Sequence, residues 1–244
     1  MLVFGHRGAC GYLPENTMES FELAFEQGAD AIEFDVVLTS DEVPIIRHDD
    51  DLTLTTDIAA KSFPSSLAHE LPWSEVRSLR AIERYAHRET SREFNGKFSI
   101  PTLQDVLENP KFAGKHLIIE IKYGPFLKSK GLDPISNTVR VIEESNWKSR
   151  GLRLTIESFD FSILSEFKRA LSDPQIEFFF LSAPDTLPQG HTKLTAELID
   201  EISLEFDGLS VAIPMLFDSD VVSLAKDREL PLYCYTARVE TAQG

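Results

Sequence analysis

The chain has 244 residues, and 24 lysines and arginines against 40 aspartates and glutamates give a formal net charge of −16. A hydrophobic content of 42% is sufficient for a buried core and excludes a disordered or fibrous protein. The acidic balance argues against a nucleic-acid-binding protein and against adhesion to anionic lipid, because both need clustered lysine and arginine. A small phosphorylated substrate needs only a local positive site and is not excluded.

The cysteine count and the hydropathy pattern bear on location. Cys10 and Cys234 make no disulfide framework, which predicts a reducing compartment. No run of about 18 apolar residues is present, so no membrane span is expected. The four apolar residues at the N-terminus are too few for a signal peptide and are typical of a first β-strand. We therefore expect a cytoplasmic protein.

Short β-rich runs alternate with helical stretches along most of the chain. This order predicts right-handed β-α-β units around a parallel sheet. A turn at Ser40-Asp41 separates the second strand from a short extension at 43–46. The seven expected scaffold strands are 2–4, 31–38, 116–122, 152–158, 176–182, 209–213 and 231–236.

The first helix is expected at residues 17–27, where apolar side chains recur with helical spacing. Asn16 followed three residues later by Glu19 resembles a capping box, and Gly28 is a typical helix stop. The other helices are expected at 101–107, with Pro101 as the first helical residue, and at 137–146, 161–171, 194–202 and 218–228.

This pattern predicts one domain over residues 1–244, built as a TIM (β/α)8 barrel. Residues 50–99 are polar and irregular, and we expect them to form an insertion over the barrel rim after the second strand. A complete barrel needs eight strands, whereas the sequence supplies seven and ends at Gly244. The eighth strand is therefore expected to be missing, through an early end of the chain or closure by other means.

Two carboxylates lie on one face of the second strand. Glu33 and Asp35 are two residues apart and share a face, while Phe34 shares the other face with its apolar neighbours. Adjacent carboxylates inside a barrel repel each other and are costly to desolvate. A bound Mg²⁺ or Ca²⁺ would remove both problems. The alternative is a pair at the strand end that reaches solvent.

The third strand carries a similar pair. Glu120 and Lys122 are two residues apart in an apolar strand and would both face the barrel interior. One interpretation is a buried ion pair. The functional interpretation makes Glu120 a third metal ligand and Lys122 a phosphate contact.

Two histidines follow strands at what would be the same rim. His6-Arg7-Gly8 closes the first strand, and His48-Asp49 follows the extension of the second. Strict alternation would send His6 and Arg7 to opposite faces, so both reach one site only if the strand ends there. Histidine suits acid–base chemistry near neutral pH, and Asp49 would orient the His48 ring or merely open the next turn. The remaining histidines and both cysteines have no such placement.

Together these residues resemble the glycerophosphodiester phosphodiesterase family over nearly the whole chain. The ordered series, with its spacing kept, is far more specific than any one tripeptide. It consists of His6-Arg7-Gly8, Glu15-Asn16-Thr17, Gly28-Ala29-Asp30, Glu33, Asp35, His48-Asp49, Leu52, Thr55-Thr56, Pro101-Thr102-Leu103, Val106-Leu107, Glu120-Ile121-Lys122 and Ser158-Phe159.

The resemblance implies a TIM barrel that hydrolyses glycerophosphodiesters to glycerol 3-phosphate and an alcohol with one divalent cation, Mg²⁺ or Ca²⁺. Either water or the substrate's own 2-hydroxyl would be the nucleophile. By position, the family's metal ligands fall on Glu33, Asp35 and Glu120, its acid–base histidines on His6 and His48, its phosphate contacts on Arg7 and Lys122, its rim carboxylate on Glu15, and an aromatic surface for glycerol on Tyr235.

The chain departs from the family at three places. Leu54 stands where the family often has arginine, Tyr235 to Arg238 replace a Trp-Thr-Val-Asn segment, and the last strand is missing. The missing strand and the changed segment keep open the alternative of a catalytically silent binding protein or a defective fragment. A lipid phosphodiesterase of the phospholipase D or sphingomyelinase D type on the same barrel is the other alternative, and it would favour secretion and an exposed apolar rim loop.

Overall fold

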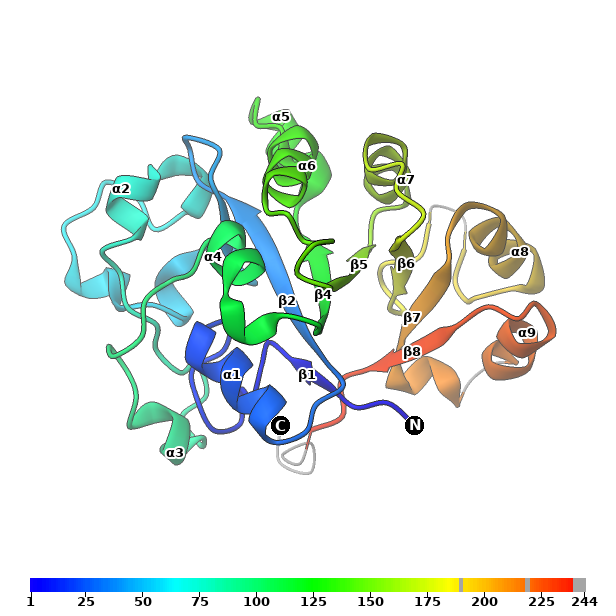
Figure 1. Cartoon of the computed structure of the whole chain (residues 1–244), viewed down its shortest axis with the longest axis horizontal. Coiled ribbons are helices and arrows are strands. Elements are labelled where there is room, and N and C mark those ends of the chain that lie inside the picture. Colours follow the sequence, from blue (N-terminus) through cyan, green and yellow to red (C-terminus); the bar gives the residue numbers. More distant parts are fainter. Residues whose placement is uncertain (189–190, 218–219, 239–244) are drawn as a thin grey trace. The chain divides into compact units, whose positions relative to one another are not determined.

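The computed structural model describes residues 1–188, 191–217 and 220–238. The chain forms two compact units, Met1–Thr155 and Ile156–Gly244. Figure 1 shows the strands and helices of each unit along the chain. The strands of the first unit are β1 (Phe4–His6), β2 (Ala31–Leu38), β3 (Pro44–Ile46) and β4 (His116–Ile121).

Three strands of the first unit run parallel, with β2 between β1 and β4. All eight residues of β2 are buried, as expected for the centre of a parallel sheet. The register places His6 beside Glu33 and Asp35 beside Glu120, so the polar residues of adjacent strands meet at the carboxyl ends. The expected extension at 43–46 is β3, which turns back and pairs antiparallel with β2.

Short helices cover the first unit. The N-cap of α1 is Thr17, whose hydroxyl accepts from the Ser20 N–H at 3.3 Å. The expected cap at Asn16 is therefore wrong, because Asn16 has a left-handed φ of 56° and donates its amide to Asp35. The helices are α1 (Met18–Glu26), α2 (Trp73–Val76), α3 (Glu89–Arg92), α4 (Leu103–Glu108), α5 (Gly124–Ser129) and α6 (Pro134–Glu144).

The start of α4 also differs from the expectation. Its N-cap is Thr102, which forms a capping box with Asp105, and Pro101 lies before the helix. The reciprocal bonds between Thr102 and Asp105 satisfy two N–H groups that the helix itself leaves unpaired. This gain fixes the helix start at Leu103, two residues beyond the position that the proline indicated.

Residues 50–99 form short turns of helix around a small core of their own. The sequence did not predict this core, because the apolar residues that form it are few and widely spaced in a polar stretch of the chain. The 3₁₀ turns in this part of the chain are η1 (Leu52–Leu54), η2 (Asp57–Ala60) and η3 (Ala68–Glu70). The buried cluster consists of Val37, Ile45, Leu52, Ile58, Ala68, Leu71, Val76, Leu79, Ala81 and Ile100, which attaches the segment to β2 and β3.

The second unit contains a parallel sheet in the order β6, β7, β8. Phe179 of β6 stacks on Tyr233 of β8 at 4.3 Å, and Gly208 of β7 leaves room for the Phe179 ring, which a Cβ there would meet at 2.2 Å. The elements are β6 (Ile176–Ser182), β7 (Gly208–Ala212), β8 (Leu232–Tyr235), α7 (Phe161–Ala170), α8 (Ala196–Glu205), α9 (Val221–Asp227) and η5 (Ile213–Leu216).

The seven scaffold strands expected from the sequence are all present, with β5 (Arg153–Ser158) spanning the boundary between the units. After β8 no further strand occurs in the described part of the chain, and residues 241–244 lie outside it. The expected helix at 218–228 also begins outside it. No helix among the described residues has the length and apolar character needed to cross a membrane.

Gly8 follows β1 in a position that excludes a side chain. Its φ is +84°, and a Cβ would lie 2.5 Å from the Ser20 hydroxyl and 2.7 Å from the Ser20 carbonyl carbon. We expect Gly8→Ala to lower the free energy of unfolding by about 2–4 kcal/mol, measured by urea denaturation. Gly11→Ala is the matched control, because a Cβ there meets nothing within 4 Å. Equal stability of the two variants would contradict this account.

His116 predicts a pH dependence of stability. Burial and the charge of Arg153 lower its pKa to about 4, and its Nε2 lies 2.8 Å from the Thr155 hydroxyl. In the unfolded chain His116 therefore gains a proton as the pH falls through about 6.5, whereas in the folded chain it does so only near pH 4. The free energy of unfolding falls as the pH drops through this window, because the unfolded chain binds the proton more tightly. We expect a loss of about 1–3 kcal/mol between pH 7 and 4.5 that His116→Gln does not show. Parallel urea titrations at both pH values would test this; equal losses would contradict it.

Candidate active site

The carboxyl ends of β1, β2 and β4 bring together the polar residues that the sequence singled out in the first unit. Parallel strands end at the same edge of a sheet, so side chains near those ends converge. His6 comes from β1, Glu33 and Asp35 from β2, and Glu120 from β4. All three carboxylates are buried.

The three carboxylates form one acidic cluster. One oxygen each from Glu33, Asp35 and Glu120 lies within 4.8 Å of the other two. Asp35 is completely buried, and its Oδ1 accepts no hydrogen bond from any described residue. A buried carboxylate oxygen in this state is costly unless a cation lies against it. The cluster therefore fits a hard divalent cation that prefers oxygen ligands.

Two basic side chains border the acidic cluster. Arg7 Nε lies 3.3 Å from Asp35 Oδ2, and Arg7 Nη1 donates to Glu15 Oε1 at 3.1 Å. Lys122 Nζ donates to Glu120 Oε1 at 2.7 Å and lies 3.8 Å from Asp35 Oδ1. The acidic and basic residues predicted from the sequence thus meet at this edge of the sheet. Glu15 belongs to the same group through its hydrogen bond with Arg7.

Arg7 reaches this site because β1 ends at His6. Arg7 takes a left-handed φ of 58°, which breaks the strand alternation that would have sent the two side chains to opposite faces. Its N–H donates to the Glu33 carbonyl at 2.8 Å and lies 3.1 Å from Glu33 Oε2. The two hydrogen bonds stabilise a conformation that a non-glycine residue rarely adopts.

The pKa values of Asp35 and Glu120 are shifted in opposite directions. Burial alone would raise the pKa of Asp35, but the charges of Arg7, His48 and Lys122 outweigh it and hold that pKa well below its usual range. Burial raises the pKa of Glu120 despite the attraction of Lys122. Burial alone would lower the pKa of Lys122, but Glu120 and Asp35 raise it, so the ammonium stays charged.

The two histidines lie at the edge of the cluster and are partly exposed. His6 Nε2 is 3.8 Å from Glu33 Oε2. His48, which follows β3, places Nδ1 2.6 Å from Asp49 Oδ1 and Nε2 3.2 Å from Lys122 Nζ. The carboxylate at Nδ1 assigns the proton to that nitrogen, so that Nε2 is the acceptor.

Two further residues of the site were not recognised from the sequence as functional. Asn16, interpreted as a helix cap, donates its amide to Asp35 Oδ2 at 2.8 Å. Arg84, from the insertion, donates to both Glu15 and Asp49. The Glu15-Asn16-Thr17 motif could have indicated that Asn16 belongs to the site, whereas no local sequence pattern indicates this for Arg84.

Tyr235, the predicted aromatic surface, belongs to the second unit. Its hydroxyl donates to the Ser182 carbonyl at 2.8 Å, and its ring meets Phe159 edge-on at 6.0 Å. These contacts hold the ring at the end of β8. Its role toward glycerol stays a prediction.

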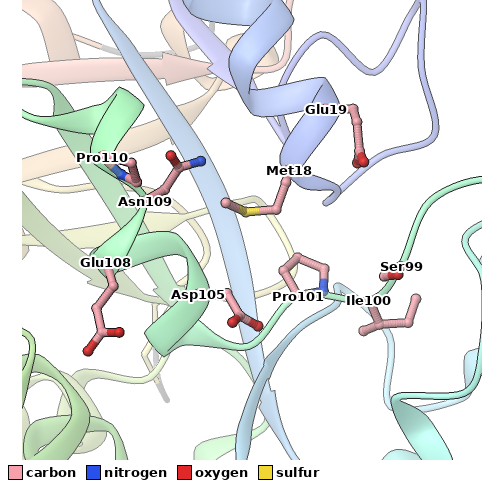
Figure 2. A pocket seen from close by; sticks show the side chains of 9 residues that line it. All are labelled: Met18, Glu19, Ser99, Ile100, Pro101, Asp105, Glu108, Asn109 and Pro110. Atoms are coloured by element: carbon pink, nitrogen blue, oxygen red, sulfur yellow. The ribbon is translucent and has the colours of Figure 1, made fainter.

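A separate cavity of about 470 Å³ lies between the start of α1 and α4, away from the predicted site residues (Figure 2). Glu19, Asp105 and Glu108 supply its charged side chains, and no lysine or arginine lines it. A phosphodiester would meet only negative charge there. The cluster at the strand ends, with Arg7 and Lys122, is the better phosphate site.

Several relatives resemble the chain. A glycerophosphodiester phosphodiesterase of Haemophilus influenzae is 30% identical over 192 residues, which cover 70% of this chain and 52% of the relative. A putative glycerophosphodiester phosphodiesterase of Bacillus subtilis is 38% identical over 126 residues, covering 51% of this chain and 46% of the relative. The aligned part thus spans about half the length of these two relatives.

Solved structures resemble the chain over a larger share. A putative glycerophosphoryl diester phosphodiesterase from Silicibacter pomeroyi has a TM-score of 0.78 at 24% identity, covering 97% of this chain and 83% of that one. An Oleispira antarctica phosphodiesterase in complex with the product sn-glycerol-3-phosphate has a TM-score of 0.77 at 27% identity, covering 99% and 86%. The expected TIM-barrel fold class is thereby confirmed.

The family model described as the glycerophosphoryl diester phosphodiesterase family matches residues 6–243. The match begins at His6, the first predicted site residue, and extends past Tyr235, the last. It therefore covers both compact units and every residue that carried the resemblance. The chain belongs to the glycerophosphoryl diester phosphodiesterase family.

Proposed function

We propose that the chain hydrolyses glycerophosphodiesters to glycerol 3-phosphate and an alcohol, with a divalent cation, Mg²⁺ or Ca²⁺, held by Glu33, Asp35 and Glu120. The observation that carries this proposal is the convergence of three buried carboxylates with Arg7 and Lys122 at one sheet edge. The Oleispira antarctica relative, which holds sn-glycerol-3-phosphate, supports the substrate class.

The charge balance of the cluster suits a phosphodiester. Three carboxylates against the two cations Arg7 and Lys122 leave one negative charge, which repels a monoanionic substrate. A divalent cation would reverse the sign to one positive charge. The bound cation then attracts the diester anion, which the cluster without a cation repels.

When bound, the cation would withdraw charge from the phosphoryl group. Arg7 and Lys122 stabilise the negative charge that builds on the phosphoryl oxygens, and both are already oriented by ion pairs with the buried carboxylates. Arg7 keeps its proton, since Asp35 and Glu15 outweigh the effect of burial and raise its pKa. Neither group has to reorganise much as the reaction proceeds.

The two histidines supply proton transfer. His48 accepts the proton of the attacking oxygen at Nε2, because Asp49 holds the proton on Nδ1. The attacking oxygen is that of water, or that of the substrate's own 2-hydroxyl, in which case a cyclic phosphate forms and a water molecule then opens it to glycerol 3-phosphate. As the phosphorus–oxygen bond to the alcohol breaks, His6, whose Nε2 lies 3.8 Å from Glu33 Oε2, protonates the departing oxygen.

The test is the release of glycerol 3-phosphate from purified protein and a panel of glycerophosphodiesters, coupled to glycerol-3-phosphate dehydrogenase. We expect turnover that stops with a chelator and returns with Mg²⁺ or Ca²⁺. Lysophospholipid and sphingomyelin in the same panel test for a lipid phosphodiesterase. Turnover of lipids alone would replace the proposed substrate, and no turnover on any diester with either cation would refute the proposal.

A further inference from the structure

Arg84 is a partly buried arginine that the insertion places beside two site residues. Its side chain is 12% exposed, and Nη2 donates to Glu15 Oε1 at 2.9 Å and to Asp49 Oδ2 at 2.6 Å. Glu15 and Asp49 are 34 positions apart in the sequence and lie in different loops. One guanidinium therefore joins two loops of the barrel rim.

Each of these carboxylates holds a residue of the proposed reaction. Asp49 Oδ1 lies 2.6 Å from His48 Nδ1, and Glu15 Oε1 accepts from Arg7 Nη1 at 3.1 Å. In both cases one carboxylate lies between Arg84 and the side chain that takes part in the proposed reaction, His48 or Arg7. Arg84 is thus one step removed from the acid–base histidine and from the phosphate-binding arginine.

The backbone on both sides of Arg84 is well anchored. The Glu83 N–H donates to Asn95 Oδ1 at 2.8 Å, and the Tyr85 N–H donates to Glu83 Oε1 at 2.9 Å. The Glu83 carboxylate is itself fixed by the Ser91 hydroxyl at 2.6 Å. A side chain that starts from such a backbone loses little further freedom on bridging two carboxylates.

The charge of Arg84 also bears on Asp49. Burial would raise the pKa of Asp49, but the bonds and charges of His48 and Arg84 outweigh burial and lower it to about 2. A firmly ionised Asp49 keeps the proton on His48 Nδ1, so that Nε2, which lies 3.2 Å from Lys122 Nζ, is the acceptor. Without the guanidinium, Asp49 would lose the ion pair that orients it, and one positive charge fewer would lie on the far side of the carboxylate from the His48 ring.

We propose that Arg84 is a positioning residue of the reaction, through which the insertion fixes Asp49 and His48, and secondarily Glu15 and Arg7. The inference rests on the proposed phosphodiesterase function. It gives residues 50–99 a role at the site, because this segment supplies the guanidinium that pairs with both Glu15 and Asp49.

The experiment compares Arg84→Gln and Arg84→Lys with Arg92→Gln. Arg92 is an exposed arginine of the same insertion whose guanidinium donates to the Ala86 carbonyl at 3.3 Å. We expect Arg84→Gln to lower kcat by roughly 10- to 100-fold, because misplaced catalytic groups cost about that much. Arg84→Lys should recover part of the loss, since an ammonium still pairs with both carboxylates. Arg92→Gln should behave like the wild type.

A merely structural role is tested by two further readouts. The acidic limb of the kcat/KM profile should move to higher pH in Arg84→Gln, and in an Asp49→Asn background Arg84→Gln should cost little more. NMR titration of the His48 ring, assigned with His48→Gln, follows the same shift without turnover. It separates the two proposals: an inactive wild type refutes the function, whereas an unshifted His48 in folded Arg84→Gln refutes the role of Arg84.

Discussion

Replacing Glu33 by glutamine is expected to abolish glycerophosphodiester hydrolysis and to weaken binding of Mg²⁺ or Ca²⁺, with the fold kept. Glutamine preserves the shape of the side chain but removes one of the three charges that face a single point between β2 and β4. A bound cation contributes several kcal/mol of charge stabilisation, so its loss should lower kcat/KM by at least about 10³-fold. Coupled assays and isothermal titration with each cation measure the two effects.

Glu19→Gln is the matched control for this variant. Glu19 is an exposed carboxylate of α1 that lines the cavity of Figure 2 and is not part of the acidic cluster. We expect its activity and cation binding to equal those of the wild type. If Glu33→Gln keeps a normal rate in the presence of a chelator, the three carboxylates do not form the metal site.

Replacing His48 by alanine should lower kcat by at least about two orders of magnitude, because the ring is the proposed general base. KM should change less, since Arg7 and Lys122 remain to bind the phosphoryl group. Steady-state kinetics over a range of pH would also show whether the acidic limb of the profile disappears with the ring. Cation binding should survive, which distinguishes this variant from Glu33→Gln.

His87→Ala provides the comparison for His48→Ala. His87 is an exposed histidine of the insertion whose ring lies 5.5 Å from that of Tyr85. Its loss should leave kcat unchanged. A near-normal rate for His48→Ala would remove this histidine from the mechanism and would leave His6, or an unprotonated substrate oxygen, to account for the chemistry.

Much of the fold and the site followed from strand periodicity. The spacing of Glu33 and Asp35 predicted that they share a face, and the register shows Asp35 opposite Glu120 of the neighbouring parallel strand. All seven scaffold strands could be placed because each is a short apolar run bounded by polar turns. These signals are local, so one sequence is sufficient to detect them.

Features that depend on contacts between distant residues could not be predicted in this way. The left-handed φ of Arg7 brings its side chain to the same site as His6, and nothing in the strand pattern indicates that turn. Asn16 satisfied every local rule for a helix cap, yet its amide binds Asp35, 19 residues away. Arg84 lies 69 residues from Glu15, and only the packing of the insertion joins them.

The most direct test of the account is a crystal structure grown with Mn²⁺, as a probe that scatters anomalously in place of Mg²⁺, together with glycerol 3-phosphate. We predict one anomalous peak coordinated by Glu33, Asp35 and Glu120, with the phosphate against Arg7 and Lys122. A peak at some other place, or three carboxylates paired only with arginine and lysine at saturating Mn²⁺, would contradict the metal site on which the proposed reaction depends.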